Sequence, residues 1–356
     1  MPSKMLNSPV ARIDLAAIRS NLALVGSLAP KSRVLAVVKA NAYGHGAAEV
    51  AGALPDADAL CVARVEEGMA LRAAEITRPI VVLEGFIDRD ELEACRIERL
   101  TPALHSRFQV DMLKQSPHAD LPVWIKLDTG MHRLGFSVEE FRAGMTTGDA
   151  LNVAAVMSHF ANADDPDNAE NRDQIEIFLE MTHDLDVELS IANSGGIINY
   201  PNSHLDWVRP GVMLYGGSPA GVPDVRLRPA MTLTAPVMSV NHIMQGESIG
   251  YGSAWVASED TRVAIIGIGY ADGYPREMPE GAPVILHGKR RGIVGRISMD
   301  MTFVQLEPGD DVVPGDMATL WGDGLPVDEV ASLYGTISYT LMSGLTNRVR
   351  RVYESD

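Results

Sequence analysis

The sequence predicts an α/β protein, with a (β/α)8 barrel over residues 10–230 and a mostly β domain over residues 231–356. In the first part of the chain, short apolar runs alternate with helical patterns, which is typical of parallel strands joined by helices. Beyond about residue 228 helical patterns become rare, and glycine and proline turns separate the apolar runs. Several apolar runs of the first part are followed by polar residues, as in barrels that gather their chemistry from many strand ends: Lys39, Lys126, Asp128, His159, Asn193, Ser194 and Arg209.

An open doubly wound sheet fits the same alternation, and only the positions of the polar residues favour the closed barrel. Residues 11–15 are expected to form a short strand, after which Asp14 caps a helix with Ile18, Leu22 and Val25 on its buried face. The apolar run at 34–38 is rich in valine and predicts a strand buried on both faces. Later strands are expected at 59–62, 80–83, 122–127, 153–157 and 188–191, and helices at 90–97 and 167–185.

The second domain is predicted from short apolar runs between turn residues, with one helix embedded at 327–333. Its strands are expected at 237–243, 263–268, 284–286, 292–297, 302–306 and 318–321.

Charge and cysteine content limit the kinds of partner. The chain has 356 residues and a net charge of −17, which argues against nucleic acid and anionic membranes. Cys61 and Cys95 are too few for a disulfide framework and suit a reducing compartment. The first residues lack the apolar core of a signal peptide, and no apolar stretch is long enough to span a bilayer. We therefore expect a cytoplasmic protein that acts on a small molecule.

Lys39 is the first candidate catalytic residue, because it directly follows the strand at 34–38 and precedes a loop of small residues at 40–46. Burial disfavours the ammonium form of lysine, and a neutral amine is needed for carbonyl chemistry, including attachment to pyridoxal phosphate. A lysine that extends its charged end into solvent at the end of a strand is the alternative interpretation.

Long motifs accompany this lysine at 126–135, 158–161, 209–211, 269–274 and 296–300. Together with residues 34–46 they resemble the alanine racemases, which are barrel-type pyridoxal 5'-phosphate enzymes, and the resemblance extends from residue 11 to residue 353. It implies the barrel fold, the cofactor pyridoxal 5'-phosphate and the interconversion of L-alanine and D-alanine, either to supply peptidoglycan synthesis or to degrade D-alanine. It also implies that residues 11–15 pair with the second domain.

The resemblance assigns roles to the residues around the cofactor. The phosphate would be held by Tyr43, Ser194, Gly211, Val212 and Tyr339, since small residues let backbone N–H groups approach a phosphate. Arg209 would face the ring nitrogen of the cofactor. A guanidinium keeps its proton, so it would leave that nitrogen unprotonated and restrain side reactions such as transamination.

Racemisation needs proton exchange on both faces of one carbon, so two bases are expected. The resemblance gives Lys39 and Tyr251 these roles, with a hydrogen-bonded chain from Tyr251 through His159 to Arg209 stabilising the phenolate. It also implies a homodimer with shared active sites, in which one chain supplies Lys39 and its partner supplies Tyr251.

The remaining assignments concern the substrate. Lys126 would carry a carbamate that orients Arg133 toward the substrate or cofactor. His132 stands where the commonest form of the motif has glycine, which puts the local loop geometry in question. Met299 would line the site, and the entrance would be formed by Tyr270, Tyr339, Arg276, Arg296 and Asp164. No metal is expected.

Two other functions compete with racemisation. A barrel-type pyridoxal phosphate decarboxylase would share the two-domain architecture, but Arg209 and the Tyr251 motif argue against it. A non-catalytic pyridoxal phosphate carrier would resemble the barrel alone, and the second domain argues against that.

Overall fold

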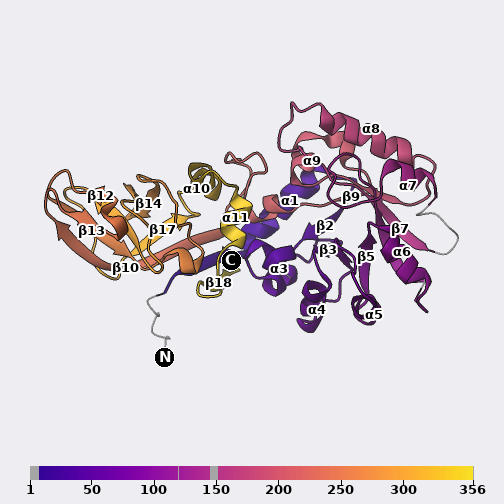
Figure 1. The fold of residues 1–356 in the computed structure, drawn as a ribbon, viewed down its shortest axis with the longest axis horizontal. Coiled ribbons are helices and arrows are strands. Elements are labelled where there is room, and N and C mark those ends of the chain that lie inside the picture. The colour runs from indigo at the N-terminus through magenta and orange to yellow at the C-terminus, as the bar shows by residue number, and fades with distance from the viewer. Residues whose placement is uncertain (1–7, 119, 145–150, 356) are drawn as a thin grey trace. The chain divides into compact units, whose positions relative to one another are not determined.

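The computed structural model describes residues 8–118, 120–144 and 151–355. By their contacts these residues divide into two compact units (Figure 1). The barrel unit is Arg19–Leu214, and the sheet unit combines the described residues up to Ile18 with those from Tyr215 onward. The chain passes between the units within helix α1 (Leu15–Leu28) and again after Leu214.

The barrel unit is built on eight parallel strands in its described residues. Each strand is hydrogen-bonded to its neighbours in the order β8-β7-β6-β5-β4-β3-β2-β9. Because β9 pairs with β2, the last strand of the unit returns to the first. The strands are β2 (Arg33–Val37), β3 (Ala59–Val62), β4 (Ile80–Val82), β5 (Leu100–Leu104), β6 (Pro122–Lys126), β7 (Asn152–Met157), β8 (Glu188–Ser190) and β9 (Trp207–Val208).

Strands β8 and β9 complete the ring by two hydrogen bonds beyond the regular ladder. The N–H of Arg209 donates to the carbonyl of Ala192 at 2.9 Å, and the hydroxyl of Ser190 donates to the carbonyl of Trp207 at 2.9 Å. A cyclic strand order is incompatible with an open doubly wound sheet, so the prediction of a nearly closed barrel is confirmed. In Figure 1 helices are arranged around these strands; they include α3 (Ala47–Ala53), α4 (Val65–Ala73), α5 (Arg89–Ile97), α6 (Arg107–Lys114), α7 (Val138–Arg142), α8 (Glu170–Thr182) and α9 (Ser194–Asn199).

Strand burial and helix capping follow from the local sequence. All four residues of β3 are buried, as expected for a parallel strand covered on both faces. Asp14 accepts from the N–H of Ala17 at 2.7 Å at the start of α1, and Ile18 and Val25 are fully buried. The helix predicted on this pattern is therefore confirmed.

The sheet unit contains a second eight-stranded sheet, which is mostly antiparallel. Its main path runs β15-β14-β17-β10-β1-β18, and β13 pairs with both β10 and β16. The strands are β1 (Val10–Asp14), β10 (Met231–Ile243), β13 (Thr261–Ile266), β14 (Pro283–Leu286), β15 (Lys289–Gly292), β16 (Thr302–Leu306), β17 (Met317–Trp321) and β18 (Arg350–Glu354). Two helices, α10 (Val327–Tyr334) and α11 (Ser338–Ser343), and a small ladder of β11 (Ser248–Ile249) with β12 (Trp255–Val256) complete the unit as described.

Strand β10 connects the parts of this sheet. Its first half pairs with β1 and β17, and after a bulge between Val237 and Ser239 its second half pairs with β13. Strand β1 lies between β10, to which it is antiparallel, and β18, to which it is parallel. The first strand of the chain is therefore part of the sheet unit, as the resemblance implied.

The prediction of a strand at 292–297 was wrong. The ladder of β15 ends at Gly292, and only an isolated bridge joins Ile293 to Val304. The apolar residues of this segment are buried, but Gly295 has φ +64°, which interrupts the extended backbone. A buried apolar run is thus not sufficient for a strand.

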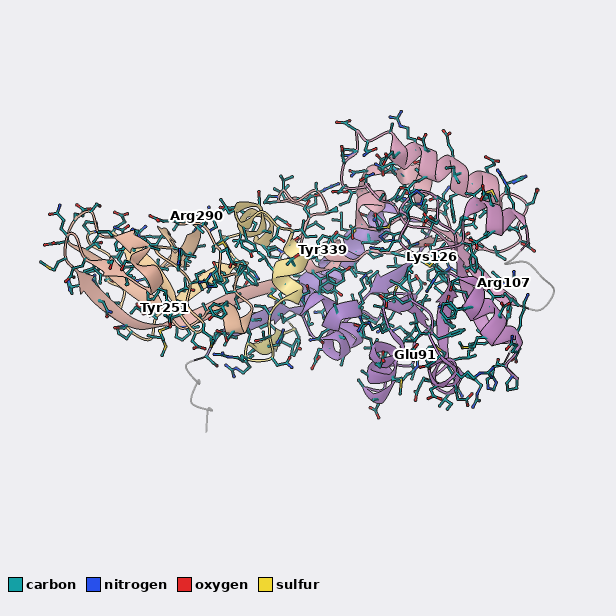
Figure 2. The ribbon with its side chains drawn as sticks, in the orientation of Figure 1. Glu91, Arg107, Lys126, Tyr251, Arg290 and Tyr339 are labelled. Atoms are coloured by element: carbon teal, nitrogen blue, oxygen red, sulfur yellow. The ribbon has the colours of Figure 1, made fainter. Side chains whose placement is uncertain are left out.

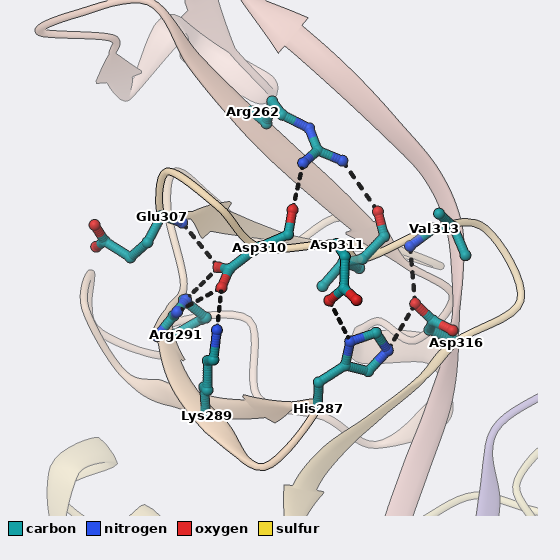
Figure 3. A network of polar contacts seen from close by, with 10 residues as sticks. Arg262, His287, Lys289, Arg291, Glu307, Asp310, Asp311, Val313 and Asp316 are labelled. Carbon is teal, nitrogen blue, oxygen red and sulfur yellow. Dashed lines mark hydrogen bonds and ion pairs between the residues drawn. The ribbon is translucent and has the colours of Figure 1, made fainter.

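A polar network joins the β14–β15 hairpin to the segment 307–316 (Figure 3). The carboxylate of Asp310, 7% exposed, receives two hydrogen bonds from Arg291, at 2.5 and 2.7 Å, and one from Lys289. In the same network His287 lies between two carboxylates, with Nδ1 3.0 Å from Asp311 and Nε2 2.9 Å from Asp316. Both ring nitrogens therefore donate, which requires the charged imidazolium.

Among the helices of the described residues, none combines the length and apolarity that crossing a bilayer would require.

Candidate active site

The segment after β2 positions Lys39 by an unusual turn. Ala40, Asn41, Ala42 and Tyr43 all have φ between 51° and 54°, so the chain makes a left-handed turn at Lys39–Tyr43 (α2). Residues with a side chain adopt this conformation at a cost of about 1 kcal/mol or more each. Strain of this kind is typical of functional sites, where the surrounding structure maintains it.

Two side chains hold the Lys39 turn. Glu67 of α4 accepts from the N–H of Ala40 at 2.6 Å and, with its other oxygen, from the N–H of Ala63 at 2.8 Å. Asn41 accepts from the N–H of Ala47 at 2.9 Å and so links the turn to the start of α3. Glu67 could not be predicted from the sequence, because its hydrogen bond to the Lys39 turn joins residues 27 positions apart.

A cradle of small groups lies after β8 and β9. The hydroxyl of Ser194 accepts from the N–H of Gly211 at 2.9 Å, and Asn193 caps α9 by accepting from the N–H of Gly196 at 2.9 Å. A Cβ on Gly211 would lie 2.5 Å from the hydroxyl oxygen of Tyr43. Any larger residue at this position would displace the Tyr43 hydroxyl, and the buried Val212 follows. The structure thus brings four of the predicted phosphate ligands together; the fifth, Tyr339, lies on α11 of the sheet unit (Figure 2).

Arg209 is 3% exposed and is fixed by groups at the ends of two strands, β7 and β8. Its guanidinium donates to the hydroxyl of Ser190 at 2.6 Å and to the carbonyls of Ser158 and Ile191 at 2.5 and 3.3 Å. Burial lowers the pKa of Arg209 to about 10, so it remains a cation at neutral pH. At this depth of burial, Arg209 is not part of a surface salt bridge.

His159 is the neighbour of Arg209. Its Nδ1 lies 3.2 Å from a guanidinium nitrogen of Arg209, and its carbonyl accepts from the buried Gln174 at 3.0 Å. Burial, together with the cations Arg209, Lys126, Arg133 and Lys39, lowers the pKa of His159 well below its ordinary value. The same four cations surround one end of the barrel, which suits an anionic ligand although the whole chain is acidic.

Lys126 ends β6 and is 6% exposed. Burial and then the positive charges of Arg209, Arg133 and Lys39 lower its pKa to about 8. A larger share of the amine is therefore neutral and nucleophilic at neutral pH than in an ordinary lysine. A lysine buried to this degree is not part of an ordinary network of surface charges.

In the loop after Lys126, His132 adopts a left-handed backbone conformation although it is not a glycine. His132 has φ +54°, and the carboxylate of Asp128 accepts from the N–H groups of Gly130, Met131 and His132 at 2.9 to 3.1 Å. These hydrogen bonds hold the left-handed conformation that a glycine would adopt freely. Arg133, which follows, is exposed.

Cys61 is a buried neighbour that sequence analysis did not assign to the site. It is the penultimate residue of β3, and burial raises the pKa of its thiol to about 12 despite the nearby cations Arg209, Lys39 and Lys126. A thiol in this state is protonated and unreactive at neutral pH.

The sheet unit carries the other predicted residues. Tyr251 is 69% exposed on a turn between Gly250 and Gly252 (Figure 2), and the guanidinium of Arg296 approaches this turn, 3.1 Å from where a Cβ on Gly252 would lie. Tyr270 and Met299 are 39% and 52% exposed. Arg276 pairs with Glu277 at 3.6 Å, whereas Asp164 belongs to the barrel unit, where it is exposed.

Within the barrel unit, the predicted residues follow the carboxyl ends of parallel strands: Lys39 after β2, Lys126 on β6, His159 after β7, Ser194 after β8 and Arg209 after β9. Those ends meet at one rim of a barrel, which is where such enzymes carry their chemistry. Ser190 and Gln174 were missed in the sequence, since a buried serine or glutamine has no pattern that separates it from an ordinary core residue.

Comparison with known proteins gives one consistent result. Residues 13–219 match the family model described as "Alanine racemase, N-terminal domain", and residues 230–353 match "Alanine racemase, C-terminal domain". The chain is 46% identical to the alanine racemase of Aeromonas hydrophila, covering 98% of this chain and all of that one. It is 44% identical to the biosynthetic alanine racemase of Escherichia coli, covering 96% and 98% of the two chains.

Comparison with solved structures gives the same result as comparison of sequences. The biosynthetic alanine racemase of Pseudomonas aeruginosa superimposes with a TM-score of 0.93 at 42% identity, over 98% of this chain and all of that one. The alanine racemase of Bartonella henselae, solved with covalently bound pyridoxal phosphate, gives a TM-score of 0.91 at 31% identity, over 98% and 99%. The two family models together match most of the chain, so this chain belongs to the alanine racemase family.

Proposed function

We propose that this chain interconverts L-alanine and D-alanine with pyridoxal 5'-phosphate as cofactor and two catalytic bases. The observation that carries the proposal is the gathering of Lys39, the Ser194–Gly211 cradle and Arg209 at strand ends of one barrel in a chain of this family. When bound, the pyridoxal group withdraws electron density from the amino acid and so acidifies its α-hydrogen.

The residues present fit this cofactor. With no side chain at Gly211, its backbone N–H lies beside the hydroxyls of Tyr43 and Ser194, and such a group of small donors suits a phosphate. Lys39 would hold the cofactor covalently, while Tyr43, Ser194, Gly211, Val212 and Tyr339 would hold its phosphate. The four cations around His159 would balance the negative charge of phosphate and substrate carboxylate.

Arg209 would donate to the ring nitrogen and so keep it unprotonated. A carboxylate at this place would stabilise the proton on that nitrogen, whereas a guanidinium has donors only. Ser190 and the carbonyls of Ser158 and Ile191 fix its orientation. This arrangement favours returning a proton to the α-carbon over decarboxylation, which argues against the alternative enzyme.

Lys39 and Tyr251 would exchange the proton on opposite faces of the α-carbon. The neutral His159 would donate from Nε2 to the phenolate of Tyr251, since its Nδ1 accepts from Arg209. We propose that Tyr251 comes from the partner chain of a two-fold homodimer, as a phenol that is 69% exposed on a glycine-flanked turn can complete a neighbouring site.

Substrate contacts complete the proposal. A carbamate on Lys126 would form by attack of the neutral amine on carbon dioxide, with loss of a proton, and would turn a buried cation into an anion facing Arg133. Arg133 would then approach the substrate carboxylate. Met299 would line the site, and Tyr270, Tyr339, Arg276, Arg296 and Asp164 would line its entrance.

The cellular role follows from the reaction. D-alanine is a peptidoglycan component, so synthesis for the cell wall or degradation of D-alanine would both use it. Cys61 and Cys95 are buried free thiols, which supports the cytoplasm as location. The barrel unit would act as the cofactor domain and the sheet unit as the domain that supplies Tyr251.

The test is incubation of purified protein with pyridoxal phosphate and L-alanine, following D-alanine by chiral separation. We expect D-alanine to approach equal amounts with L-alanine, and the Lys39→Ala variant to form almost none. Release of carbon dioxide would instead indicate the decarboxylase, and cofactor binding without turnover would indicate the carrier.

A further inference from the structure

Three loops of the sheet unit are joined at one point. The segment 269–273 carries Tyr270, the segment 298–301 carries Met299, and the segment 344–348 follows α11, which carries Tyr339. All three residues belong to the entrance or lining proposed above. The contacts among these segments fix the positions of the three residues relative to one another.

The first two segments touch through backbone. The N–H of Tyr270 donates to the carbonyl of Ser298 at 3.2 Å, and the N–H of Ala271 donates to that of Met299 at 3.0 Å. A Cβ on Gly269 would lie 2.3 Å from the carbonyl oxygen of Ser298. No side chain fits between the two segments, so a shift of one moves the other.

The third segment is tied to the first at Asp272, which is 2% exposed. The backbone of Asp272 accepts from the N–H of Thr346 at 3.0 Å, and the hydroxyl of Thr346 donates to the carbonyl of Ala271 at 3.0 Å. Inside its own segment, the carboxylate of Asp272 accepts from the N–H of Gly269 at 3.0 Å.

Arg348 joins all three segments with one side chain. Its Nε lies 3.1 Å from Asp272, and its Nη2 donates to Asp300 at 2.6 Å. One guanidinium therefore bridges the residue that shapes the Tyr270 turn and the residue next to Met299. A rigid fork between two carboxylates fixes distance and direction, which a lysine cannot reproduce.

We propose that Arg348, through Asp272 and Asp300, is a positioning residue that holds Tyr270 and Met299 at the spacing which admits alanine and rejects larger amino acids. The inference rests on the proposed racemase function and adds the residues that set its substrate size. Arg348 would touch neither substrate nor cofactor and would act only through the two loops that carry Tyr270 and Met299.

The experiment compares wild type, Arg348→Ala, Arg348→Lys and Arg290→Ala for racemisation of alanine and of 2-aminobutyrate, which is one methylene longer. Arg290, labelled in Figure 2, is the matched control, because it is also an arginine of the sheet unit, is 51% exposed like Arg348, and pairs with Glu329. In Arg348→Ala we expect the ratio of kcat/KM for 2-aminobutyrate over alanine to rise roughly three- to tenfold, a part of what one methylene can contribute.

Arg348→Lys should fall between wild type and Arg348→Ala, and Arg290→Ala should keep the wild-type ratio. An unchanged ratio in Arg348→Ala, or the same rise in Arg290→Ala, would overturn the proposal. If Arg348→Ala does not fold, Asp300→Asn takes its place, since this half-exposed side chain can be altered on the surface.

Amide hydrogen exchange separates this inference from the proposed function. In Arg348→Ala, exchange should increase in both 269–273 and 298–301, whether or not the protein racemises alanine. If wild type fails to racemise alanine while the coupled exchange is seen, the proposed function fails and the loop coupling stands. Faster exchange in only one of the two segments contradicts the coupling itself.

Discussion

The guanidinium of Arg209 donates to Nδ1 of His159 at a distance of 3.2 Å. Arginine has no acceptor, so Nδ1 must accept and the ring proton of neutral His159 must lie on Nε2. Burial, together with four nearby cations, lowers the pKa of His159 well below its ordinary value, so the ring is neutral at physiological pH. His159 is therefore oriented to donate a hydrogen bond from Nε2.

Arg209→Glu should change which reaction follows loss of the α-hydrogen. A carboxylate would stabilise a protonated ring nitrogen, so racemisation should fall by about 100-fold or more while transamination per turnover rises. The measurement is the ratio of pyruvate to D-alanine formed from L-alanine. Arg209→Lys, which keeps the charge, should change this ratio less, and a constant ratio in both variants would refute the role of Arg209.

Lys39 should be the residue that binds the cofactor covalently. Reduction with borohydride in the presence of pyridoxal phosphate should fix the label on the peptide that contains Lys39, because the strained turn presents this amine at the barrel rim. Peptide mass spectrometry locates the label. Recovery mainly on Lys126, which is also buried and has a lowered pKa, would contradict the assignment.

Lys39→Ala and Tyr251→Phe variants should complement each other. Each homodimer of one variant should be nearly inactive. If the two variants assort at random, about half of the dimers contain one chain of each, and one of the two sites in such a dimer carries neither mutation. Roughly a quarter of all sites should then be active. The two variants are co-expressed with different tags, and the mixed dimer is isolated and assayed. A mixed dimer without activity would place both residues in one chain's site.

Lys126 should take up carbon dioxide more readily than an ordinary lysine. Because its pKa is lowered to about 8, the neutral amine increases as pH rises through that value, and the carbamate should increase with it. Carbon-13 NMR after addition of labelled bicarbonate should show a carbamate signal that Lys126→Gln lacks. Lys126→Glu, which restores an anion, should retain more activity than Lys126→Gln; equal losses would argue that the carbamate has no function.

His287 should stabilise the sheet unit at acidic rather than alkaline pH. Asp311 and Asp316 raise the pKa of His287 above its ordinary 6.5. Its stabilisation is therefore fully present below pH 6.5 and is lost as pH rises through the raised value. His287→Gln should lower Tm at pH 6 and leave it nearly unchanged at pH 9, while His242→Gln, an exposed control on β10, should show no such difference. A loss of Tm that is equal at both pH values would contradict the charged pairing.

The sequence by itself determined the local features of this protein. A valine-rich run followed directly by lysine located Lys39, and polar residues after several apolar runs, Arg209 among them, favoured a barrel. The helix with Ile18 and Val25 inward could be predicted in the same way, because helix periodicity and capping depend on residues within a few positions of each other. The motifs of the family then supplied roles that no pattern of spacing could have assigned.

Only the tertiary structure decided how these features meet. The pairing of β9 with β2 distinguishes a barrel from an open sheet, and it joins residues that are more than 170 positions apart. Other contacts of the site and the loops also join residues far apart in the sequence. They are the hydrogen bonds of Glu67 to the Lys39 turn, of Arg209 to Ser190, and of Arg348 to Asp272 and Asp300. The left-handed conformation of Ala40 to Tyr43 runs against local preference, and it persists because contacts from distant segments maintain it. Backbone conformational preference depends on residues within a few positions of each other. The free energy that closes a barrel and holds a buried arginine comes from non-local contacts instead, and composition and spacing do not specify these contacts.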